Sequence, residues 1–81
     1  MVLRRDISAD YVAVGALRDE IIAIAERHGL AGEALFAAKL ATEEILINAI
    51  KRRRASAAAV RMRVEAEITG AGVKLTAREA D

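Results

Sequence analysis

A carboxylate and a carboxamide lie four residues apart in the stretch LATEEILINAIKRRR, which runs from Leu40 to Arg54. If this stretch is helical, Glu44 and Asn48 stand one turn apart on the same helix face. A carboxylate can take a proton, and the amide oxygen of an asparagine is a hard donor. Asparagine is otherwise a poor residue for a helix interior. The alternative interpretation is a solvent-facing glutamate beside an exposed or backbone-bonded asparagine.

The elements that would position this pair follow from hydrophobic periodicity and from capping residues. Ser8 and Asp10 are candidate helix caps, and Gly29 closes the first helix as a left-handed residue. His28, beside Gly29, is expected to cap the helix end rather than to bind a metal. In chain order we predict a strand at Val2 to Ile7, a helix from Tyr11, a helix from about Gly32 to Arg54, and strands at Val60 to Ile68 and Val73 to Arg78.

This order of strand, helix, helix, strand and strand predicts an α+β fold, with two helices packed on one face of a small sheet. Alternation of apolar and charged residues in VRMRVEAEI indicates a strand with one buried face. The residues expected to form the core are Leu35, Phe36, Leu40, Ile47, Val64, Ile68 and Leu75.

Length and composition limit the class of protein. We expect residues 1–81 to form a single domain, because 81 residues leave no room for a second core. The absence of cysteine excludes disulfides and thiolate metal sites. No apolar run approaches the roughly 20 residues that span a bilayer, and no apolar signal core follows Met1, so a cytoplasmic protein with no membrane contact is expected.

The charge pattern argues against nucleic acid as the partner. The formal net charge is only +1. The run from Lys51 to Arg54 could bind phosphate or nucleic acid, but four cations at a helix end also complement its dipole. No aromatic side chains interleave with them to stack on bases. We therefore treat a small basic nucleic-acid-binding protein as the least favoured alternative.

The segment KLATEEILINAIK resembles the N box of the Bergerat-fold ATPases, the class that includes histidine kinases and gyrase, and most closely that of the anti-sigma-factor serine/threonine kinases. The resemblance covers the N-terminal, N-box-containing part of that domain. It implies that Glu44 is the general base, that Asn48 is a magnesium ligand, and that Asn48 and Lys51 bind the cofactor ATP. It also implies an ATP-dependent kinase activity and a sigma factor or anti-anti-sigma protein as partner.

The end of the chain departs from the family pattern. Glu79 falls where the family has its adenine-recognising aspartate, and Asp81 falls where a glycine follows it. The lid and the second glycine box are not found in these 81 residues, so we expect nucleotide binding and catalysis to be impaired. The alternative is a non-catalytic remnant or engineered fragment that acts as a homo-oligomeric interaction module. An alanine-rich core with two aromatic residues is light, which favours a homodimer with the C-terminal hairpin at or near its interface.

Overall fold

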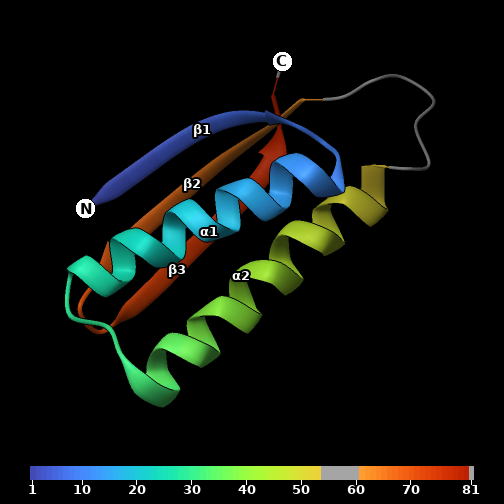
Figure 1. Cartoon of the computed structure of the whole chain (residues 1–81). Helices are drawn as coiled ribbons and strands as arrows, with labels where there is room; N and C mark the ends of the chain where they lie inside the picture. The colour runs from blue at the N-terminus through green and yellow to red at the C-terminus, as the bar shows by residue number, and fades with distance from the viewer. Residues whose placement is uncertain (54–60, 81) are drawn as a thin grey trace.

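Two antiparallel helices cover one face of a three-stranded antiparallel sheet (Figure 1). The computed structural model describes residues 1–53 and 61–80, so the predicted ends at Arg54 and Val60 lie outside the described residues. The element order confirms the predicted α+β fold. The elements are β1 (Val2–Ser8), α1 (Tyr11–Arg27), α2 (Gly32–Arg53), β2 (Arg61–Thr69) and β3 (Gly72–Glu79).

Local sequence signals explain where α1 begins and ends. The Asp10 side chain accepts a hydrogen bond of 2.8 Å from the backbone N–H of Ala13, as an N-cap does. His28 is the C-cap residue, and its backbone N–H donates to the carbonyl oxygens of Ile24 and Ala25. Gly29 follows with φ of 97°, a left-handed conformation that glycine adopts without strain. The predicted caps at Asp10 and Gly29 are therefore confirmed, and His28 stands at the C-cap position through its backbone, whereas Ser8 ends β1 and is not the N-cap.

The sheet has the order β1-β2-β3, with β2 in the centre. Along β2 the side chains of Met62, Val64, Ala66 and Ile68 are buried, and the residues between them are exposed or half-buried. The register pairs Val64 with Arg5 of β1 and with Ala77 of β3. Because successive side chains of a strand point to opposite faces, one face of the sheet meets the helices and the other is polar.

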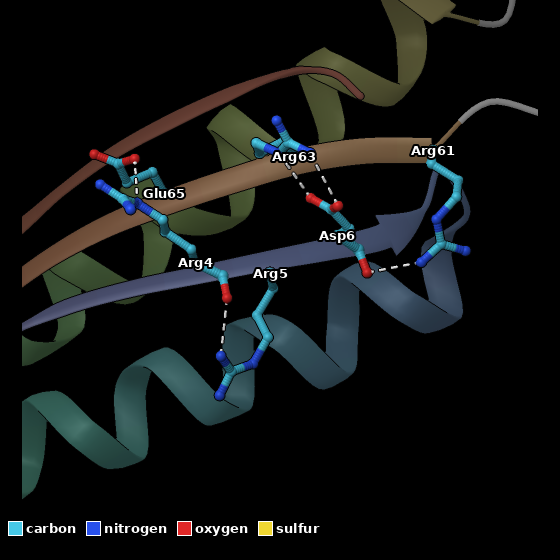
Figure 2. A network of polar contacts seen from close by, with 6 residues as sticks. All are labelled: Arg4, Arg5, Asp6, Arg61, Arg63 and Glu65. Carbon is cyan, nitrogen blue, oxygen red and sulfur yellow. Dashed lines mark hydrogen bonds and ion pairs between the residues drawn. The ribbon is translucent and has the colours of Figure 1, made fainter. Parts of the chain in front are cut away.

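Figure 2 shows ion pairs that hold β1 to its neighbours. Asp6 accepts two hydrogen bonds from the Arg63 guanidinium, at 3.0 and 3.2 Å, and Arg4 pairs with Glu65 at 2.9 Å. The hydrogen bond from Arg63 holds the pKa of Asp6 below its ordinary value. On the helix side, Arg5 makes a forked contact with Glu20 of α1. An inward-pointing charge of this kind also protects an edge strand from unwanted pairing.

The core lies between the sheet and the two helices, with α1 over β1 and β2 and with α2 against α1 and β3. The predictions for Val64 and Ile68 are confirmed, and Leu35 and Leu75 pack at the edge of the core. The structure describes these buried core residues: Leu3, Val14, Leu17, Ile21, Ile24, Ala25, Leu30, Leu46, Ala49, Ile50, Met62, Val64, Ala66 and Ile68.

The prediction of which face of α2 is buried is wrong, because the helix is turned about its axis relative to the predicted orientation. Phe36 and Leu40 are 63% and 49% exposed, and Ile47 is only half-buried. The buried residues of α2 are instead Thr42, Leu46, Ala49 and Ile50. Apolar side chains surround most of this helix, so its periodicity does not mark one buried face. No helix among the described residues is long and apolar enough to cross a membrane.

Candidate functional site

The face of α2 that carries Glu44 and Asn48 lies on the surface of the molecule. Glu44 and Asn48 are both exposed, and their spacing of four residues places them on one face of the helix. Neither side chain has a hydrogen bond or ion pair with a side chain in the ranges 1–52 and 61–80. Their oxygens are therefore open to a ligand from solvent.

A lysine extends the same face towards the C-terminal end of α2. Lys51 is exposed and follows Glu44 by seven residues, which is about two helical turns. Arg52 is exposed as well, and the last residue of the basic run, Arg54, lies outside the described residues. The face thus presents a carboxylate, an amide and an ammonium group in succession, and the ammonium group suits a phosphate.

Glu43, the neighbour of Glu44, has a different environment. Its carboxylate accepts a hydrogen bond of 2.6 Å from Nη1 of Arg18 on α1, and both side chains are partly buried. Arg18 also donates to Asp19, and the hydrogen bonds with Asp19 and Glu43 raise the pKa of the Arg18 guanidinium above its ordinary value. The sequence predicts that Glu43 faces solvent and pairs at most with neighbours such as Lys39. This prediction is wrong, because Glu43 is half-buried and pairs with Arg18 of α1.

Sequence reasoning did not identify Arg18 as a residue near this site. It precedes Glu43 by 25 positions, so no short motif joins them. In the sequence Arg18 is one of three consecutive charged residues of the first helix, followed by Asp19 and Glu20, and its partner across the helices depends on how the two helices pack.

Glu79, the residue predicted to replace the adenine-recognising aspartate of the family, is the last residue of β3. Glu79 is exposed and lies opposite Met62 of β2 in the register. Asp81, which would take the glycine position, lies outside the described residues. The equivalence of Glu79 with the adenine-recognising aspartate stays a prediction.

Three hollows among the described residues lie away from the exposed face of α2. They lie at the turn between β2 and β3, between β1 and α1, and on the outer face of the sheet. None of the three is lined by Glu44, Asn48 or Lys51. Within the part of the chain that the structure describes, no group of three or more histidine, aspartate and glutamate side chains could hold a metal ion.

The donor set on α2 nevertheless fits a phosphate-bound magnesium ion. Magnesium is commonly held by one or two protein oxygens, with waters and substrate phosphates completing its shell. Asn48 and Glu44 offer an amide oxygen and a carboxylate without competing protein partners in the described residues. These two oxygens could complete the shell of a magnesium ion whose other ligands are waters and phosphate oxygens.

Comparison with known proteins identifies the family of this chain. The family model described as a histidine kinase-like ATPase domain matches residues 7–81. The match includes both helices, the two strands of the hairpin and the whole exposed face of α2. A search of curated proteins found no match.

Proposed function

Because this chain belongs to the family of histidine kinase-like ATPase domains, we propose that it binds magnesium-ATP on the exposed face of α2. The observation that carries the proposal is the position of Glu44 and Asn48, which share this face and have no partner among the described residues. The family membership supplies the ligand class, and the helix face supplies hard oxygen donors with a lysine beside them.

Each of the three residues has a distinct role in the proposal. The amide oxygen of Asn48 binds magnesium, and the ammonium group of Lys51 binds phosphate oxygens. Glu44 is the general base, which takes a proton from a hydroxyl group or from water. Magnesium, when bound, neutralises charge on the phosphates and links them to the protein. An exposed helix face encloses little of a nucleotide, so we expect weak binding and impaired catalysis.

We further propose that the domain is of the anti-sigma-factor serine/threonine kinase type and acts in the cytoplasm. The support is the segment KLATEEILINAIK, in which an acidic pair is followed by three apolar residues, then by Asn48 and Ala49, and soon after by a cation, Lys51. On this proposal the protein partner is a sigma factor or an anti-anti-sigma protein. Phosphorylation of a serine in a candidate partner, lost in Glu44→Gln, would test the subtype separately from nucleotide binding.

Exposed apolar side chains support a second role, as a homodimeric interaction module. Phe36 and Leu40 stand one turn apart on α2 and are largely exposed. Among the described strands, β3 pairs with β2 along one edge only, and a free edge can pair with another chain. We propose a twofold homodimer at micromolar concentration, with the β2–β3 hairpin at or near the interface. Light scattering that gives a mass near 8.7 kDa throughout that range would contradict it.

Calorimetric titration with ATP tests the nucleotide proposal. We expect heat of binding with magnesium present and much less heat when a chelator removes it. Asn48→Ala should abolish the magnesium-dependent part, because it removes the proposed metal ligand. Glu33→Gln is a matched control, since Glu33 is an exposed residue at the opposite end of the same helix. Binding that is indifferent to magnesium and to Asn48→Ala would overturn the proposal.

A further inference from the structure

Two consecutive glutamates of α2 have different surroundings, and the difference bears on the nucleotide site. The carboxylate of Glu43 lies 2.6 Å from Nη1 of Arg18, with side-chain exposures of 35% and 25%. Glu44 is exposed and has no ion pair with a side chain in the ranges 1–52 and 61–80. Successive residues of a helix are rotated by about 100°, so the Arg18 contact directs Glu43 towards α1 and Glu44 away from it.

The guanidinium of Arg18 is itself fixed by α1. Its Nε and Nη2 atoms both donate to Oδ1 of Asp19, at 3.1 and 3.0 Å, which leaves Nη1 for Glu43. Because a guanidinium is planar and its donors are in a fixed arrangement, these bonds set the direction in which Nη1 points. Charge-assisted hydrogen bonds of this length are also the stronger ones in proteins. The hydrogen bonds to Asp19 therefore orient Nη1 of Arg18 towards one carboxylate of α2, that of Glu43.

The charge of the site depends on that pairing. A triphosphate is anionic, and each uncompensated carboxylate nearby repels it. A second free carboxylate beside Glu44 would also compete for magnesium as a hard oxygen donor. With Glu43 paired to Arg18, the face that carries Asn48 presents Glu44 as its one unpaired carboxylate.

We propose that Arg18 is a positioning residue of the nucleotide site, which acts by holding the Glu43 carboxylate on α1 and away from the bound triphosphate. This inference rests on the proposed binding of magnesium-ATP to α2. It assigns Arg18 no contact with the nucleotide. Arg18 acts through Glu43, and its loss should harm binding only while Glu43 keeps its negative charge.

The test compares four variants of the full chain by magnesium-ATP titration and by thermal unfolding. Arg18→Met should weaken binding by about threefold to tenfold at low salt, because it releases one negative charge near the phosphates. The double variant Arg18→Met/Glu43→Gln should recover most of the affinity, since the released carboxylate is gone. Arg18→Lys should keep part of the affinity, because an ammonium group can still pair with Glu43.

Arg27→Met is the matched control, because Arg27 is an exposed arginine at the C-terminal end of the same helix and its loss makes the same change in net charge. It leaves Glu43 paired with Arg18, so the affinity should stay within about twofold. A merely structural role for Arg18 predicts a different pattern. The double variant would then bind no better than Arg18→Met, because neither contains the ion pair and both have a lower Tm.

The outcomes separate this inference from the proposed function. If the unsubstituted chain binds no magnesium-ATP, the proposed function and the inference fail together. If it binds and Arg18→Met binds equally well, the inference alone is overturned. Failure of Glu43→Gln to restore affinity in the Arg18→Met background also overturns it. Restored affinity together with an unrestored Tm is the result that supports it.

Discussion

Leu46 and Leu40 of α2 are a matched pair for testing which face of the helix is buried. Leu46 is fully buried in the core, whereas Leu40 is 49% exposed. Leu46→Ala removes buried methyl groups and leaves a cavity, which costs about 2.7–5 kcal/mol in comparable sites. At the typical stability of about 0.05–0.15 kcal/mol per residue, this is a large part of the free energy of unfolding. Leu40→Ala should change it by about 0.5 kcal/mol or less, because alanine suits an exposed helix position.

Thermal unfolding followed by circular dichroism measures both variants under one condition. A loss of 1 kcal/mol lowers the Tm of a domain of this size by about 4–8 °C, so Leu46→Ala should lower it by at least about 10 °C. Leu40→Ala should lower it by no more than about 4 °C. Equal losses in the two variants, or a larger loss in Leu40→Ala, would refute the assigned rotation of α2 and with it the exposure of Glu44 and Asn48.

Two further predictions concern the turn of the hairpin and the sheet. A Cβ added at Gly70 would lie 2.7 Å from the carbonyl oxygen of His28, so Gly70→Ala should lower the free energy of unfolding by about 1–3 kcal/mol in a denaturant titration. A Cβ added at Gly72 would have no atom within 4 Å, so Gly72→Ala is the control and should lower it little. The hydrogen bond from Arg63 lowers the pKa of Asp6 in the folded chain. The ion pair therefore stabilises the fold fully at pH values above the pKa that Asp6 has in the unfolded chain, and this contribution is lost as the pH falls through the lower pKa of the folded chain. Below about pH 4, Asp6→Asn should therefore show a shallower loss of stability with falling pH than the unsubstituted chain; an identical slope would contradict this.

The strands and the end of the first helix could be predicted because their signals are local. Alternation in VRMRVEAEI predicts which side of β2 is buried, and the structure confirms it at Val64 and Ile68. Asp10 and Gly29 act through backbone groups within a few residues, so their capping roles are also visible in sequence. The candidate pair on α2 could be predicted for the related reason that residues four apart share a helix face.

The rotation of α2 and the partner of Glu43 depend on packing between elements. Phe36 and Leu40 are as apolar as Leu46, so hydrophobicity does not identify which of them meets the sheet. The small buried residue Ala49 lets the helix approach closely, and this preference appears only when the facing elements are known. Arg18 reaches Glu43 across the two helices for the same reason. Long-range contacts of this kind have no period and no fixed spacing in the sequence.

Nuclear magnetic resonance mapping shows whether magnesium-ATP binds to the exposed face of α2, because it locates the ligand even when binding is weak. With magnesium present, ATP should shift the amide signals of α2 around Glu44, Asn48 and Lys51 more than those of the outer face of the sheet. Asn48→Ala should remove those shifts while leaving the fold, and therefore the rest of the spectrum, unchanged. Saturating magnesium-ATP that leaves the α2 signals in place would contradict the proposed site. Shifts that are largest at the β2–β3 hairpin and persist in Asn48→Ala would contradict it as well.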